Sequence, residues 1–277
     1  MRLLKQLLPV AVVAFIGGQV IAAVQGKALL SLVLGLATAV LAVLVYARMV
    51  RWSERRAPVE VAAKGATTRI GLGVLIGVGW FAAVIANIAF LGDYRVDGRG
   101  TVMGAVGLFG FMAAAAVTEE LMFRGVLFRI IEGRTGTWMA LLVTSVLFGG
   151  WHLLNPDASL WGAIAIAVEA GGTLAAAYAA TRNLWIPIGL HFGWNFAEAG
   201  IFGTEVSGNG KNDGLLHSVT SGSTLVTGGR FGPEASPYTI VFGVLLTIVF
   251  MWLAHRRGNL VPRRGGARVV ATASLAQ

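Results

Sequence analysis

The chain has 277 residues, of which 56% are hydrophobic and only 13% are charged. Charged residues make up about a quarter of a soluble domain, so this composition excludes an ordinary soluble protein and predicts a polytopic membrane protein. The absence of cysteine excludes thiol nucleophiles, disulfides and thiolate metal sites. The net charge of +9 does not indicate a nucleic-acid partner, because the basic residues are scattered among short loops.

Eight segments of the chain are apolar over about the 20 residues that a membrane-crossing helix needs. We therefore predict an all-α fold, a polytopic membrane helical bundle of about eight transmembrane helices, built as a single membrane domain over residues 1–277. The predicted spans cover residues 7–24, 28–47, 70–91, 102–124 or beyond, 138–154, 160–180, 184–202 and 237–254.

The positions of the basic residues predict the orientation of the bundle. If the amino terminus is cytoplasmic, all of the 22 lysines and arginines except Lys27, Arg95, Arg99, Lys211 and Arg230 fall on the inner side. Inner loops carry such an excess, so we expect cytoplasmic termini, a basic cytoplasmic tail at 255–277 and a location in the bacterial inner membrane. Residues 204–236, with seven glycines and five serines, are expected to form a long outer loop.

Three short polar motifs interrupt these apolar helices. They are Glu119-Glu120-x3-Arg124, Phe148-x3-His152 and His191-x3-Asn195. An ionisable group at membrane depth costs about 2.5–3.5 kcal/mol on insertion scales, so such groups mark functional sites. Positions four residues apart share a helix face, so three helices could bring Glu119, His152, His191 and Asn195 to one point.

Helical geometry separates the roles of the two adjacent glutamates. Neighbouring positions lie about 100° apart on a helix, so Glu119 and Glu120 cannot both point into one cavity. Glu120 and Arg124 have the spacing and order of a structural ion pair. Glu119 has no such local cation and is suited to act as a general base. Glu169 and Glu198 lie inside predicted spans and are expected to support the site.

In this order and spacing, the three motifs resemble the intramembrane proteases of the CAAX-protease and bacteriocin-processing family, also called Abi proteins, which includes the type II CAAX prenyl endopeptidases. The resemblance covers a core of about 101–203, and the run Gly-Gly-Arg-Phe-Gly-Pro-Glu-Ala-Ser in the outer loop is similar to bacterial members. It implies that Glu119 and His152 activate a water that attacks a peptide carbonyl, while His191 and Asn195 hold the oxyanion. The implied partners are membrane lipid and a membrane-anchored peptide or protein substrate.

Two questions stay open at this stage. The family is often described as metal-dependent, and two histidines with one carboxylate are a known catalytic zinc set, so Glu119, His152 and His191 would be the ligands if a metal is present. A metal-free mechanism uses the same side chains. The alternative functions are a non-catalytic scaffold or bacteriocin-immunity protein of the same fold and, less favoured because no repeat symmetry is visible, a proton-coupled transporter.

Overall fold

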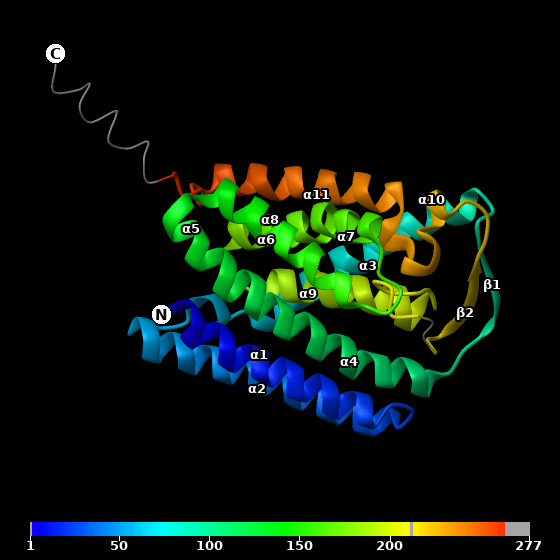
Figure 1. The fold of residues 1–277 in the computed structure, drawn as a ribbon, viewed down its shortest axis with the longest axis horizontal. Coiled ribbons are helices and arrows are strands. Elements are labelled where there is room, and N and C mark those ends of the chain that lie inside the picture. The colour runs from blue at the N-terminus through cyan, green and yellow to red at the C-terminus, as the bar shows by residue number, and fades with distance from the viewer. Residues whose placement is uncertain (1, 211–212, 264–277) are drawn as a thin grey trace, which may run out of the picture.

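The structure, a computed structural model, describes residues 2–210 and 213–263. Helices dominate it and run along its long axis (Figure 1). Within the described residues, seven helices are long and apolar enough to cross a membrane, which confirms the predicted all-α polytopic bundle. Four of them are single helices: α1 (Arg2–Ala23), α2 (Ala28–Glu54), α3 (Ala66–Phe90) and α11 (Pro237–Arg256). The other three are composite. Val102–Thr135 contains α4 (Val102–Glu120) and α5 (Arg129–Thr135), Thr137–Leu154 contains α6 (Thr137–Trp151) and a short turn, and Leu160–Thr181 contains α7 (Leu160–Ile166) and α8 (Gly172–Thr181).

The eighth predicted span corresponds to α9, Trp185–Asn195, and the π-helical turn Phe196–Ile201 that continues it. This helix is shorter than the other seven, and most of its side chains are buried. It lies in the middle of the bundle, and the start of α1 and the end of α11 lie at the same end of the molecule (Figure 1). That placement agrees with an even number of passes, while the count of eight membrane crossings remains a prediction.

Glycines on both helices hold α9 against α3. A Cβ atom at Gly73 or Gly77 of α3 would clash with the backbone of α9, and one at Gly189 or Gly193 of α9 would clash with the backbone of α3. Small residues allow two helix backbones to approach closely. Because His191 lies between the two glycines of α9, this contact determines where its side chain is placed.

Three π-helical segments interrupt the regular helices, and the sequence analysis predicted none of them. They are Leu121–Phe128, Ala167–Gly171 and Phe196–Ile201. The first directly follows the two adjacent glutamates, and the other two contain Glu169 and Glu198. Since π-helical turns occur mostly as single turns and often at functional sites, their position marks the same region as the polar motifs.

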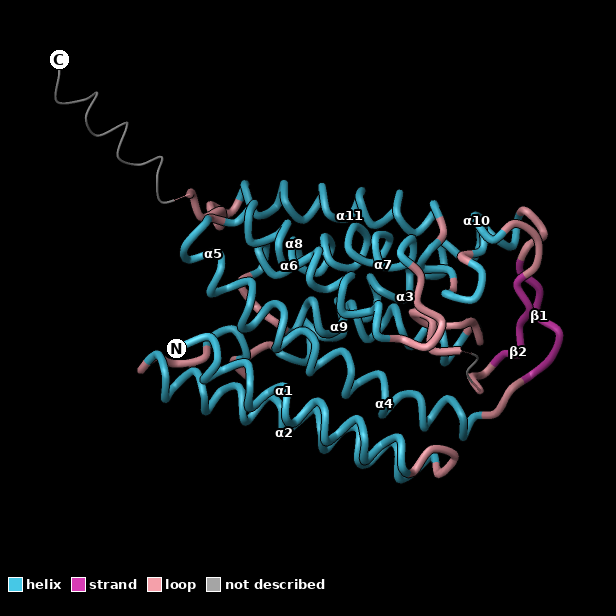
Figure 2. Tube along the Cα trace, in the orientation of Figure 1, coloured by secondary structure: helices cyan, strands magenta, loops and turns pink. Residues whose placement is uncertain are grey.

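The end of the bundle opposite the start of α1 carries a small sheet that was not predicted. The strands β1, Tyr94–Arg99, and β2, Leu216–Thr220, pair in antiparallel register (Figure 2). The predicted irregular loop 204–236 thus contains β2, the short helix α10, Thr224–Thr227, and two 3-10 turns, Gly229–Phe231 and Pro233–Ala235. Residues 211 and 212 of this loop, and the part of the predicted tail from 264 onward, lie outside the described residues.

The other end of the bundle is held together by ion pairs. Glu54, at the end of α2, pairs with Arg129 at 2.7 Å. Glu60, between α2 and α3, accepts hydrogen bonds from Tyr46 and Arg56. Burial alone would raise the pKa of Glu60, but the hydrogen bonds from Arg56 and Tyr46 outweigh it and lower the pKa below its ordinary value of 4.5. The ionised form of Glu60 therefore stabilises this end.

Candidate active site

The ion pair predicted between Glu120 and Arg124 is present and completely buried. Arg124 Nη1 lies 2.7 Å from Glu120 Oε1, and both side chains have 0% exposure. Arg124 also donates to the carbonyls of Ala170 and Gly171, at 3.3 and 3.2 Å, and its guanidinium lies 4.4 Å from the centre of the Phe148 ring. The orientation argument counted Arg124 among the inner basic residues, and this was wrong because its charge lies inside the bundle.

His191 lies between the two adjacent glutamates. Its Nδ1 is 3.0 Å from Glu120 Oε1, and its Nε2 is 3.9 Å from Glu119 Oε2. Nδ1–H therefore donates to Glu120, which orients the ring. Glu120 pairs with Arg124 and lines neither of the two cavities described below, but it also contacts His191 directly. The two carboxylates do leave the helix in different directions, but the two nitrogens of one imidazole ring approach both.

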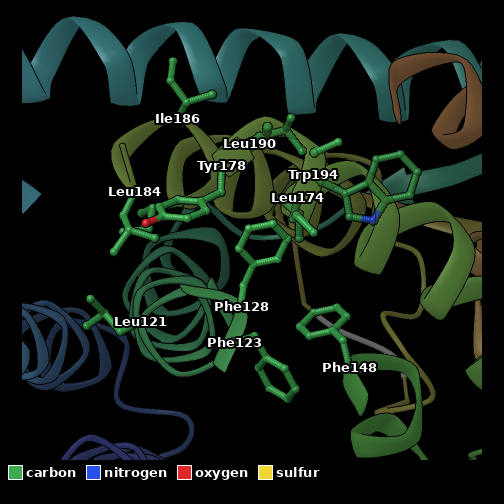
Figure 3. Packing of buried hydrophobic residues seen from close by; sticks show 14 of the residues in the cluster. Leu121, Phe123, Phe128, Phe148, Leu174, Tyr178, Leu184, Ile186, Leu190 and Trp194 are labelled. Carbon is green, nitrogen blue, oxygen red and sulfur yellow. The ribbon is translucent and has the colours of Figure 1, made fainter. Parts of the chain in front are cut away.

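His152 is placed by Phe148, as their spacing predicted. The helix α6 ends at Trp151, and His152 begins the short 3-10 turn His152–Leu154. Its Nδ1–H donates to the Phe148 carbonyl at 2.8 Å, so Nε2 carries the lone pair when the ring is neutral. The Phe148 ring lies 4.8 Å from the His152 ring and 5.9 Å from the His191 ring. In Figure 3 it lies within the buried cluster next to Phe123, so hydrophobic packing holds the Phe148 ring beside both histidines.

Three of the four predicted catalytic residues line one cavity. His152, His191 and Asn195 surround a space of about 10 Å³, together with Glu234 from the outer loop. A space of this size holds about one water molecule. The structure thus brings these three motif residues together from α6 and α9, as the helix-face argument predicted.

Glu119 lines a different and larger cavity, so the four residues do not surround one space. This second cavity measures about 230 Å³ and is lined mainly by small and apolar residues of α1 and α4, with Trp151 of α6. The side chain of Glu119 is 18% exposed, and its Oε2 has no hydrogen-bond partner among the described residues. Its contact with His191 is the link between the two cavities. Glu119 lines a separate cavity because the face of α4 that carries it is turned toward α1.

Glu169 and Glu198 are fully buried, at 0% exposure. Neither carboxylate has a hydrogen-bond partner among the described residues, and neither is among the residues that line the small cavity. Arg124 interacts electrostatically with Glu169. The supporting role predicted for these two acids stays a prediction.

Glu234 is the acidic residue of the cavity that the sequence analysis did not select. It lies in the Gly-Gly-Arg-Phe-Gly-Pro-Glu-Ala-Ser segment, just before α11, and is 3% exposed. The sequence pointed to this segment, because it is similar to bacterial members of the family, but it did not point to Glu234 itself. It carried no indication of burial, since loop residues are usually solvated.

The predicted metal ligands do not form a metal site in this arrangement. Among the residues that the structure describes, no group of three or more histidine, aspartate or glutamate side chains is placed to hold a metal ion. Phe148 and Glu120 engage the Nδ1 atoms of His152 and His191, which leaves Nε2 of each ring as the possible ligand, but Glu119 lines a separate cavity. Since a catalytic zinc needs about three converging ligands, this donor set does not fit, and no chemical step is assigned to a metal.

Residues 101–197 match the protein family described as type II CAAX prenyl endopeptidase Rce1-like. This range contains all three polar motifs. Over 155 residues the chain is 30% identical to a protein of Bacillus subtilis (strain 168) that is named "Putative membrane peptidase YdiL". Both matches support the resemblance of this chain to the CAAX-protease and bacteriocin-processing family.

The similarity to a family of membrane peptidases, together with the seven apolar helices of the described residues, indicates an integral membrane protein. The aligned stretch covers 51% of this chain and 61% of the relative, so the chain spans about three fifths of the length of the curated relative it matches. No solved structure matches the chain significantly. The activity proposed below therefore rests on the geometry of the site.

Proposed function

We propose that this protein is an intramembrane endopeptidase that hydrolyses a peptide bond in a membrane-associated protein or peptide. The observation that carries this proposal is the position of His191, whose ring nitrogens face Glu120 at 3.0 Å and Glu119 at 3.9 Å. A buried histidine between two carboxylates, one of them neutralised by Arg124, is an arrangement suited to moving protons. A purely structural histidine needs only one partner.

In the proposed reaction, Glu119 accepts a proton from water while the water oxygen attacks the peptide carbonyl carbon. The distance of 3.9 Å between Glu119 Oε2 and His191 Nε2 is too long for a direct hydrogen bond. One water at about 2.8 Å from both atoms would bridge them, with roughly a right angle at the water oxygen. His152 Nε2, whose lone pair is free because Nδ1–H is engaged, is the second acceptor for the water. The carbon–nitrogen bond then breaks, and the proton passes to the leaving amine.

His191 and Asn195 are proposed to donate hydrogen bonds to the developing oxyanion. Because Glu120 engages Nδ1 of His191, Nε2 is the ring nitrogen that can donate to the oxyanion when it carries a proton. Asn195 lines the same cavity and supplies a neutral amide donor. The loss of one such donor typically raises the barrier by about 2.7–4 kcal/mol.

The larger cavity is proposed to receive the membrane-anchored part of the substrate. It places Glu119 among small residues of α1 and α4, and its rim includes Phe15 and Trp151, which are 70% and 47% exposed. Large exposed apolar residues on a membrane helix face lipid. A chain that enters beside them would reach Glu119 without crossing a polar surface, which supports a substrate that is held in the bilayer.

The test is the Glu119→Gln variant, assayed in liposomes on a panel of membrane-anchored peptides that the parent protein cleaves. Glutamine keeps the shape but cannot accept the proton, so kcat should fall by about 10²–10⁴. His152→Ala should be equally damaging, and the double variant should lose little more because both residues act on one water. Asp97→Asn, the same chemical change at an exposed position on β1, is the matched control. Full activity of Glu119→Gln would contradict the mechanism.

A further inference from the structure

We propose that Glu234 is a further residue of the active site, which positions His152 and the water between them from the opposite side of their shared cavity. The inference rests on the proposed peptidase function. It assigns a role to the outer-loop segment that the family match over residues 101–197 does not cover.

The first support is the position of Glu234 in the cavity. It lines the space of about 10 Å³ together with His152, His191 and Asn195, whereas Glu169 and Glu198 do not. Its Oε1 accepts a hydrogen bond from Trp194 Nε1 at 3.3 Å, and its Oε2 has no hydrogen-bond partner among the described residues. A buried carboxylate oxygen without a protein partner is costly. A water in the cavity would satisfy it.

The second support is the way the segment holds this side chain. Gly232 has a φ of 107°, which L side chains rarely adopt, and a Cβ there would clash with the Glu205 carbonyl. The Pro233 carbonyl then accepts from Thr239 Oγ1 at 2.6 Å, and the Ala235 carbonyl accepts from Trp161 Nε1 at 2.8 Å. The backbone on both sides of Glu234 is thus fixed, so the acid cannot turn outward to solvent.

The third support is electrostatic. Burial raises the pKa of Glu234, while the neighbouring Ser207 and His152 oppose the rise. Glu169, between α7 and α8, and Glu198, just after α9, also interact electrostatically with Glu234. Glu234 and His152 therefore interact electrostatically across the cavity that both line.

These observations define what Glu234 does. The Nδ1–H of His152 is held by Phe148, so its Nε2 faces the cavity with a lone pair. In the resting enzyme, a water bonded there needs an acceptor for its other hydrogen, which turns to Glu119 only when the water attacks. Glu234 supplies that acceptor and so fixes the orientation of the water and the ring. Because it does not hold the membrane-anchored part of the substrate, its removal should lower kcat and leave KM nearly unchanged.

The experiment compares Glu234→Gln with the parent protein in liposomes, on a peptide that the parent cleaves. We expect kcat to fall about 10–100-fold, as is typical when a supporting partner of a catalytic group is lost, with KM within twofold and the midpoint of thermal unfolding within a few degrees. Glu234→Asp, which keeps the charge, should recover part of kcat. Arg230→Gln is the matched control in the same segment, since Arg230 is 86% exposed, and it should keep parental kcat.

Two results would overturn the inference. One is Glu234→Gln protein with parental kcat per folded molecule, whether or not less of it folds. The other is a loss in Glu234→Asp as large as in Glu234→Gln, which would indicate packing rather than charge. If Glu119→Gln abolishes cleavage in the same assay, either result overturns only the role of Glu234. A parent protein that cleaves no membrane-anchored peptide overturns the proposed function and this inference with it.

Discussion

Replacing Arg124 by methionine removes the buried cation at the centre of the site and keeps a side chain of similar length. The parent side chain makes an ion pair with Glu120 at 2.7 Å, two hydrogen bonds to the carbonyls of Ala170 and Gly171, and a contact with the Phe148 ring. Its loss leaves Glu120, at 0% exposure, with His191 as its remaining partner. Breaking a buried pair in this way costs about 3–5 kcal/mol, out of a total stability that is typically about 5–15 kcal/mol.

The same reasoning predicts strong coupling between Arg124 and Glu120. Each single variant, Arg124→Met or Glu120→Gln, leaves the other charge buried without its ion-pair partner, so the two costs would sum to about 6–10 kcal/mol if they were independent. The double variant removes both charges and should cost less than the more damaging single variant. Unfolding of the purified proteins by SDS in mixed micelles measures all three. Costs that add within about 0.5 kcal/mol would refute the argument that the pair acts as a unit.

Three further predictions concern the metal, the pH dependence and the topology. Purified protein should keep its peptidase activity after exhaustive chelation, because no suitable group of donors converges in the described residues; an activity that is lost on chelation and restored by zinc would contradict this. Because Glu60 has a pKa below 4.5 in the folded protein, its stabilising contribution is complete above the pKa of the unfolded chain and is lost as the pH falls through the folded value. Unfolding midpoints measured from pH 7 to pH 3 should therefore decline below about 4.5, less steeply in Glu60→Gln, and equal slopes would count against this role. A reporter enzyme fused after Asn209 should behave as extracytoplasmic, as the distribution of basic residues predicts, and a cytoplasmic signal there would reverse the topology.

The sequence alone determined the class of fold. In lipid, the backbone N–H and C=O groups can bond only to each other, and apolar runs of about 20 residues satisfy them as helices. The sequence also identified the residues of the three polar motifs. The Glu120–Arg124 pair and the contact of Phe148 with His152 were predictable since each joins residues four apart on one helix, where the geometry is set locally. The four-residue spacing of Gly73 and Gly77 places both on one face of α3 for the same reason, but it does not show that α9 packs there.

The tertiary structure alone decided which helix faces meet. Periodicity says which residues share a face but not how far a helix is rotated against its neighbours, so the placement of Glu119 toward α1, and of His191 between two glutamates, could not be derived. The π-helical segments were equally hidden, because they arise where packing and side-chain hydrogen bonds outweigh the local preference for the α-helix. Glu234 is the clearest case. It reaches the cavity of His152 from a loop far along the chain, and only close packing of α9, α11 and that loop buries an acid that local sequence would leave in solvent.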